Sequence, residues 1–291
     1  MRGDVPETRL DSCVERCLYS TAMPDEDVVV RECVSVEDFH QCIELERAVW
    51  KDDDIDVMPI RLYMISKACN APTIGAFDQA GKLVGFVHTM VALMNGNAVY
   101  HSHMAAVVED LRHKDIGFRI KLAQRQHAIE AGIPLVIWTF DPLQSRNAHL
   151  NINKLGVVIR RYEINYYGEG VSTVFDAAVP SDRVFAEWWV SSPHVKSVLA
   201  GRATPVEDGP SEVVIPDNID EVRTTSLEEH VRWRLRVRAE FQKALAGGSI
   251  VRGFQRDART HESRYVFGVD EEQFHFDAYS GVRGSVAGLT K

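Results

Sequence analysis

The feature that most constrains the fold is a run of almost entirely apolar residues at 135–140 (LVIWTF). A strand that is apolar on both faces has to be covered on both sides, as in the centre of a sheet that helices flank. An amphipathic helical pattern at residues 116–131, closed by Gly132, precedes this run. A strand pattern at residues 98–108 (AVYHSHMAAVV) precedes the helix. This order predicts an α/β (α+β layered) structure with a mixed sheet.

The other patterns up to residue 180 extend the same design. Ser35 is a good N-cap for one helix, and Pro59 suits the first turn of a second helix. Additional strands are expected at residues 28–34, 73–77, 83–93, 157–167 and 172–179. The resulting order, β-α-α-β-β-β-α-β-α-β-β, predicts a mixed, mostly antiparallel sheet flanked by helices.

The length of 291 residues fits one domain with a large appendage or two domain-sized units. We expect a flexible N-terminal arm at residues 1–27, a layered domain at 28–180, a C-terminal extension or small α/β subdomain at 181–277, and a flexible tail at 278–291. In the extension, residues 227–245 have the pattern of a helix whose arginine-rich stretch RWRLRVR faces solvent, with an acidic partner for this stretch as the alternative. The residues expected on its apolar face are Val231, Leu235, Val237, Phe241 and Leu245.

Charge and cysteine usage limit the classes of partner. The net charge of −9 argues against nucleic acid or an anionic membrane as the default partner. The apolar runs are too short to span a membrane, and the charged N-terminus has no signal-peptide pattern. The five cysteines are odd in number and all lie in the first quarter of the chain, which is typical of reduced thiols. We therefore expect a cytoplasmic protein, and no metal site.

Residues 107–118 combine the features of an anion-binding site. A strand ends, a short polar turn follows, and a helix begins at the sequence RHKDIGF. A helix start presents free backbone N–H groups and the positive end of the helix dipole, which suit a pyrophosphate. Arg112, His113 and Lys114 add positive charge, and Gly117 permits close approach of the backbone. The alternative interpretation is an ordinary basic helix start.

This segment resembles the pyrophosphate loop of the GNAT (Gcn5-related N-acetyltransferase) superfamily, whose pattern is Arg/Gln-x-x-Gly-x-Gly/Ala. Arg112 and Gly117 fit the pattern, whereas Asp115 stands in the place of the first glycine. Residues 145–148 (SRNA) and 153–156 (NKLG) resemble the second motif of the family, and the chain resembles a poorly characterised subfamily with a long C-terminal extension. The resemblance implies that residues 28–180 bind acetyl-CoA or another acyl-CoA as a co-substrate. The residues that it implies for this site are Ala105, Ala106, Val107, Arg112, His113, Lys114, Asp115, Ile116, Gly117, Phe118 and Asn147.

Catalytic candidates follow from the chemistry of acyl transfer to an amine, which needs a base. His101 and His103 are two apart on one strand and share a face, so either suits a general base, with a hydrogen-bonded structural histidine as the alternative. A further alternative is a metal site made of both with His88 on a neighbouring strand, which requires this third ligand to be in register. Asp141 follows the central strand and is a candidate for binding the acceptor amine. The alternative is that it caps its own turn before Pro142.

The sequence does not identify the general acid that would protonate the departing thiolate, because Ile152 stands where the family usually has a tyrosine. Tyr167 is one candidate for this role, and the sequence does not choose between it and the others. The other candidates are Tyr162, Tyr166 and His149.

The sequence thus predicts an acyl-CoA-dependent N-acyltransferase that acts on a small-molecule amine by direct transfer in a ternary complex. The thioester carbonyl is expected near Ala105 and Ala106, where the strand is expected to bulge. A second hypothesis is a non-catalytic acyl-CoA-binding or interaction module, which the replacements at Asp115 and Ile152 favour. A third is a structural homodimer built by the C-terminal half. Trp188, Trp189 and Trp233 are expected to be packing or interface residues.

Overall fold

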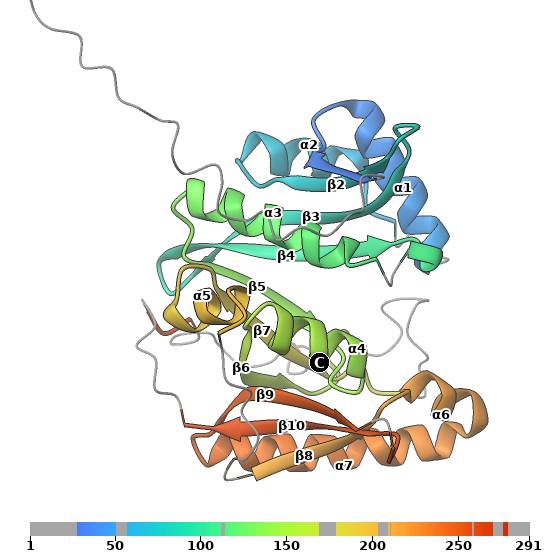
Figure 1. The fold of residues 1–291 in the computed structure, drawn as a ribbon, viewed down its shortest axis with the longest axis vertical. Helices are drawn as coiled ribbons and strands as arrows, with labels where there is room; N and C mark the ends of the chain where they lie inside the picture. The colour runs from blue at the N-terminus through green and yellow to red at the C-terminus, as the bar shows by residue number, and fades with distance from the viewer. Residues whose placement is uncertain are drawn as a thin grey trace, which may run out of the picture.

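A computed structural model describes residues 28–50, 57–111, 114–168, 179–202, 209, 211–257, 259–269 and 276–278. In this part of the chain ten strands form one continuous sheet with the order β1-β2-β3-β4-β5-β7-β6-β9-β10-β8 (Figure 1). The expected arm at 1–27, the tail from 279 and the strand at 172–178 lie outside the described residues, as do Arg112 and His113.

The first four strands form an antiparallel unit. They are β1 (Val28–Glu32), β2 (Thr73–Asp78), β3 (Leu83–Met94) and β4 (Asn97–Val107), and α1 (Val36–Trp50) and α2 (Ile60–Ala68) link β1 to β2. α1 begins as predicted, because the Ser35 hydroxyl accepts the Asp38 N–H at 3.0 Å and the Asp38 carboxylate accepts the Ser35 N–H at 3.1 Å. The strands and helices predicted for this half of the layered domain are confirmed.

The antiparallel pattern is interrupted at β5 (Leu135–Phe140). This strand pairs in parallel with β4 and antiparallel with β7 (Arg183–Trp189). The connection from β4 to β5 contains a short 3₁₀ turn, η1 (Glu109–Leu111), and α3 (Ile116–Glu130). β5 is buried along nearly its whole length, as its apolar sequence requires. The sheet is therefore mixed and mostly antiparallel, with helices on its flanks, which confirms the predicted fold class.

Two features of the layered domain differ from the prediction. β6 (Val158–Glu163) ends four residues before the predicted end at 167, because residues 164–167 form a turn in which Asn165 has a positive φ of 47°. Residues 183–189 form a separate strand, β7, that lies between β5 and β6. The structural unit therefore continues beyond the expected boundary at residue 180.

The C-terminal extension adds strands to the same sheet and helices against it. Its elements are α5 (Pro193–Leu199), β8 (Ser211–Pro216), α6 (Ile219–Thr225), α7 (Leu227–Ala246), β9 (Ile250–Asp257) and β10 (Glu262–Gly268). β9 joins β6 at the pair Ile159 and Val251, and α7 packs along β6 and β8. Figure 1 shows β8, β9, β10, α6 and α7 in orange and red at the end of the sheet opposite β1, and α5 in yellow near β5 and β7. The helix predicted at residues 227–245 is confirmed as α7.

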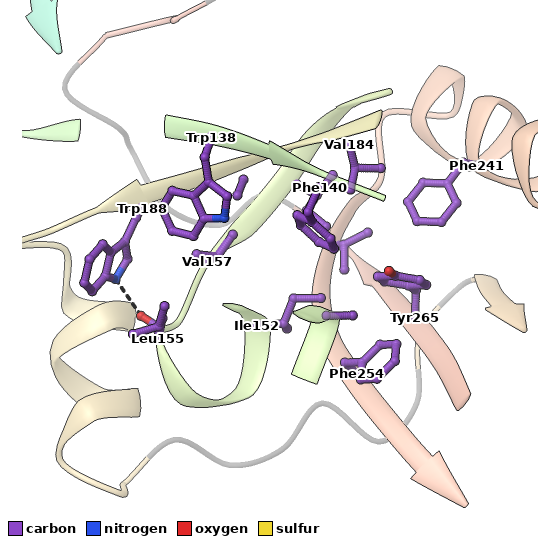
Figure 2. Close-up of a cluster of buried hydrophobic side chains, with 14 of the residues drawn as sticks. Trp138, Phe140, Ile152, Leu155, Val157, Val184, Trp188, Phe241, Phe254 and Tyr265 are labelled. Carbon is purple, nitrogen blue, oxygen red and sulfur yellow. Dashed lines mark hydrogen bonds between the residues drawn. The ribbon is translucent and has the colours of Figure 1, made fainter. Parts of the chain in front are cut away.

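One large core unites the layered domain with the extension. It includes Ile152 from the π-helical segment η2 (His149–Lys154), which follows α4 (Ser145–Ala148), together with Phe254 of β9 and Tyr265 of β10 (Figure 2). The Trp188 indole N–H donates to the Leu155 carbonyl oxygen at 2.7 Å, and Trp188 and Trp189 are both buried, so their predicted packing role is confirmed. The extension is thus built onto the core of the layered domain.

The buried faces of two helices differ from the apolar stripes expected for them. In α7, Leu235 is exposed and Arg234 is buried; in α3, Ile129 is exposed and Lys121 is buried. The hydrophobic period located both helices along the chain, but it did not indicate that each of them buries a cation, because each buried cation is held by partners that are distant in the sequence. None of the helices in the described part of the chain combines the length and the apolar composition that a membrane span needs.

Candidate active site

β4 and β5 pair only briefly and then separate. Their parallel register covers Tyr100 with Val136 and His101 with Ile137, and β4 then continues to Val107 without pairing to β5. Figure 1 shows the two strands diverging from this point. The edge of β4 that faces β5 is therefore not part of a ladder beyond His101, and the carboxyl ends of parallel strands are where α/β proteins bind ligands.

A β-bulge lies at the start of this open segment. Thr89 pairs with Ser102 and His88 pairs with Met104, so His103 is the extra residue of β4. The bulge was expected near Ala105 and Ala106, and it lies two residues earlier because the register changes between His88 and Thr89 of β3. Bulges of this kind re-aim backbone groups and side chains next to functional sites.

The bulge presents the His103 side chain, which is exposed. Its ring lies 6.1 Å from that of His101 and 6.3 Å from that of His88, between ring centroids, so the predicted common side of His101 and His103 is confirmed. Desolvation by the surrounding protein lowers the pKa of His103, and it lowers the pKa of His101 to about 4. Both rings are consequently neutral near pH 7, as a general base has to be.

His88 has a structural role instead. Its Nδ1 lies 2.8 Å from the Thr73 hydroxyl and its Nε2 lies 3.2 Å from the Ser66 hydroxyl, and burial lowers its pKa to about 3. Both ring nitrogens are therefore occupied. Among the described residues no group of three or more His, Cys, Asp and Glu side chains is arranged to hold a metal ion.

The start of α3 is not capped by a side chain. Asp115 precedes the helix in the left-handed conformation, with φ 53° and ψ 17°, and it makes no cap bond to the first turn. Among the described residues no hydrogen-bond acceptor is found for the first-turn N–H groups of Ile116, Gly117 and Phe118. The described residues therefore provide no side-chain cap at the positive end of the α3 dipole, which is the end of a helix that attracts anions.

Gly117 is not required by the packing of the protein. A Cβ atom at this position would lie 3.8 Å from the Val107 side chain, its nearest neighbour, and the φ of Gly117 is not positive. The fold itself would therefore accept an alanine here. A glycine that the fold does not need is consistent with close approach of a ligand to the backbone.

Asp115 points toward a cation and not into its own helix. Lys154 of η2 donates to its carboxylate with 2.6 Å between Nζ and Oδ1, and both side chains are partly exposed. The left-handed backbone of Asp115 is the conformation that a glycine would adopt freely at this place. Lys154 also neutralises the negative charge that was expected to repel a phosphate.

The other residues implied for acyl-CoA binding lie along the open edge of β4 and on α4. Ala105 is exposed, Ala106 is buried and Val107 is half-buried at the end of β4, and Lys114 and Phe118 are half-buried around the start of α3. Asn147 is exposed on α4. The structure thus brings together residues 105–107 and 114–118 at one end of the β4–β5 opening.

Asp141 is engaged in an ion pair. Arg234 of α7 donates to both carboxylate oxygens at 2.6 Å, and the Leu143 N–H donates to Oδ1 at 2.8 Å. Burial by itself raises the pKa of Asp141, but the charge and hydrogen bonds of Arg234 outweigh it and the pKa is lowered. This geometry favours the turn cap over a role toward the acceptor amine. It also corrects the expectation that RWRLRVR is wholly solvated, since only 3% of the Arg234 side chain is exposed.

Tyr162 of β6 and Tyr167 lie in different environments. Tyr162 donates its hydroxyl to Asp182 at 2.7 Å and packs on Phe241, and this burial raises its pKa, so it is part of the scaffold. Tyr167 is exposed in the turn after β6, with the Arg183 guanidinium 5.1 Å from its ring centre. Because β6 runs parallel to β5 across β7, this turn lies at the same edge of the sheet as the carboxyl ends of β4 and β5.

A buried polar chain near the β4–β5 opening was not predicted. Lys121 of α3 donates to the Ser102 hydroxyl at 2.7 Å and to the Gln124 side-chain oxygen at 3.1 Å, and Gln124 donates to the Thr89 hydroxyl at 2.7 Å. Burial lowers the pKa of Lys121 to about 7. No sequence pattern indicated this chain of contacts, because a lysine in a mixed helical pattern usually faces solvent.

No protein-family model and no curated protein matches the chain. Among solved structures, it is similar to a putative acetyltransferase from Acinetobacter baylyi, with 15% identity over 60% of this chain and 97% of the other and a TM-score of 0.47. It is also similar to the ribosomal-protein-S18-alanine N-acetyltransferase from Escherichia coli, with 13% identity over 57% and 95% of the two chains and a TM-score of 0.44. An aminoglycoside acetyltransferase from a soil metagenome matches with 18% identity over 43% and 86% and a TM-score of 0.39. At such TM-scores the function has to be derived from the residues of this chain.

Proposed function

We propose that the chain is an acyl-CoA-dependent N-acyltransferase, with acetyl-CoA as the default donor and a small-molecule amine as the acceptor. The observation that carries this proposal is the opening between β4 and β5, which begins at a bulge and leads to the uncapped start of α3. An open strand edge can hold an extended amide-containing arm by backbone hydrogen bonds, and a helix start can hold a diphosphate. Coenzyme A contains both groups.

The residues that would bind the donor follow from this arrangement. The N–H groups of residues 116–118 would take the diphosphate, with Lys114 and the charges of Arg112 and His113 nearby in the sequence. The edge of β4 at residues 105–107 would bind the pantetheine arm, and Asn147 on α4 would flank it. The thioester carbonyl of the donor would lie at the His103 bulge, where its oxygen would accept a hydrogen bond from a backbone N–H of β4.

The reaction would be a direct transfer in a ternary complex. The amine nitrogen attacks the thioester carbonyl carbon, a C–N bond forms, the C–S bond breaks, and the electron pair leaves with the CoA sulfur. His103 would take the proton of the amine, directly or through a water molecule, and Tyr167 would donate a proton to the thiolate. Asp141 has no part in this mechanism, because Arg234 already occupies both of its oxygens. Much of the rate would come from holding two substrates in one place.

The second candidate is a non-catalytic acyl-CoA-binding module, and the position of Ile152 favours it. Ile152 is buried in the core beside the C-terminal strands, where it has no means of donating a proton (Figure 2). This hypothesis predicts binding of acyl-CoA without release of its thiol. The enzyme hypothesis predicts both.

The test pairs calorimetry of CoA binding with a thiol-release assay that uses acetyl-CoA and a panel of small amines. Gly117→Ala is the informative variant, since its methyl group fits the protein but would meet a bound diphosphate. We expect it to weaken CoA binding by about tenfold or more, a change of about 1.4 kcal/mol or more, while the unfolding temperature stays at or above that of the wild type.

Gly268→Ala, at the end of β10, is the matched control, because its Cβ would also meet nothing closer than 3.6 Å. It should leave CoA binding unchanged. Wild-type protein that binds no CoA, or a Gly117→Ala variant with unchanged affinity, would contradict the proposed site.

A further inference from the structure

A buried lysine, Lys121, lies at the point where β4 and β5 stop pairing, which we call the vertex of the opening between them. Ser102 and Trp138 are the residues that directly follow the last β4–β5 pair on their strands. The Lys121 Nζ lies 2.7 Å from the Ser102 hydroxyl and 3.7 Å from the centre of the Trp138 ring. Lys121 thus closes the opening at its narrow end, on the side of the sheet that α3 covers.

This cation has no carboxylate partner in the described part of the chain. Its partners are a hydroxyl, an amide oxygen and an aromatic face, and only 6% of the residue is exposed. Among the described residues two other cations are similarly buried: Arg234 pairs with Asp141, and Arg125 of α3 donates to the Val190 carbonyl oxygen at 2.7 Å. A buried ammonium without a counter-ion is unfavourable unless it is neutral or a ligand supplies the negative charge. Burial indeed lowers the pKa of Lys121 to about 7, so an approaching anion would readily restore its charge.

The place of Lys121 relative to the proposed donor identifies which part of a ligand it would meet. A donor whose diphosphate lies at the start of α3 enters the opening from its wide end, so its acyl group comes nearest to the vertex. The bulge at His103, where the carbonyl would lie, is one residue from Ser102. Adjacent residues of a strand are about 3.3 Å apart, which is on the order of the reach of a short acyl chain beyond its carbonyl.

We propose that Lys121 recognises a carboxylate at the far end of the acyl group, so that the preferred donor is the CoA thioester of a short dicarboxylic acid. This inference rests on the proposed function and narrows its donor. Ser102 and Gln124 hold the ammonium in place, and Thr89 holds Gln124. A charge-assisted hydrogen bond in a buried setting gives strong selectivity for a carboxylate over a methyl group.

The experiment compares CoA, acetyl-CoA and succinyl-CoA with the wild type and with Lys121→Met, by calorimetry and by thiol release. Methionine is unbranched like lysine, is shorter by one atom, carries no charge, and suits the apolar contact with Trp138. We expect the wild type to prefer succinyl-CoA to acetyl-CoA, and Lys121→Met to reduce that preference by about tenfold or more. Lys196→Met, an exposed lysine of α5, is the matched control and should keep the wild-type preference.

The outcomes separate this inference from the function on which it depends. If CoA itself does not bind to the wild type, the donor site is absent and both proposals are overturned. If CoA binds but the wild type does not prefer succinyl-CoA, only the role of Lys121 is overturned. The same conclusion follows if Lys121→Met changes KM for a carboxylate-bearing amine and leaves the preference between donors as it was. A folded variant is recognised by its unfolding transition and by its binding of CoA.

Discussion

Asp115 should limit how tightly the start of α3 holds a diphosphate, and replacing it tests the anion site quantitatively. The backbone of Asp115 is left-handed, so Asp115→Gly relieves a conformation that disfavours other residues. The lost ion pair with Lys154 is partly exposed, and such pairs contribute about 0–1 kcal/mol. The stability of the protein should therefore change little, and any effect on binding can be assigned to charge.

The size of the binding effect follows from Coulomb's law. Two unit charges one helical turn apart, about 5.4 Å, interact by about 0.8 kcal/mol at the dielectric constant of water and about 3 kcal/mol at an effective value of 20. For a partly exposed carboxylate the lower end applies. We expect Asp115→Gly and Asp115→Asn to tighten CoA binding by about 1 kcal/mol, roughly fivefold, and Lys154→Ala to weaken it.

Calorimetry of CoA binding at low and high salt is the assay, because screening should shrink these differences as ionic strength rises. Glu262→Gln, which removes a carboxylate from an exposed position on β10, serves as the charge control. The reasoning is refuted if both Asp115 variants bind CoA no more tightly than Glu262→Gln does. It is equally refuted if Lys154→Ala binds CoA more tightly than the wild type.

Further predictions concern the scaffold and the catalytic groups. Asp141→Ala leaves Arg234 buried without its partner, so it should destabilise the fold by about 3–5 kcal/mol. Differential scanning calorimetry should then show an unfolding temperature that is lower by roughly 10 °C. Unchanged stability would argue against the structural role of Asp141. Because the pKa of Asp141 is depressed, the stabilisation is present above the unfolded value of 3.8 and is lost as the pH falls through the lower folded value, which acid titration of unfolding can follow. His103→Gln should reduce kcat by about 10²–10⁴-fold. Because the pKa of His103 is lowered, the acidic limb of the wild-type pH–rate profile should lie below pH 6.5, and His103→Gln should abolish this limb. The control His40→Gln, at an exposed position of α1, should keep it. Tyr167→Phe should reduce kcat while CoA binding is kept, and unchanged kcat would remove Tyr167 from the mechanism.

Local patterns determined much of the fold. The apolar run at 135–140 placed β5 at the centre of a mixed sheet, and the Ser35 cap placed the start of α1. The helix start at residue 116 with Gly117 nearby was also visible in the sequence, because caps, turns and periodicity act over a few residues. Cofactor-binding candidates could be named from this stretch for the same reason.

Long-range pairing was decided only by the tertiary structure. β7 enters the sheet between β5 and β6, and β9 extends it beyond β6, although no local pattern specifies which strand is the neighbour. The bulge at His103 depends on the register of β4 against β3. Register is a relation between two strands, and a single strand sequence does not contain it.

Buried charges show the same division. Arg234 and Lys121 have the composition of a solvent-facing helix surface, yet the fold buries both, one against Asp141 and one against Ser102 and Trp138. The sequence by itself determined which residues could carry charge and where helices and strands begin. The tertiary structure decided which charges lose water and which gain a partner, because desolvation depends on groups that are distant in the chain.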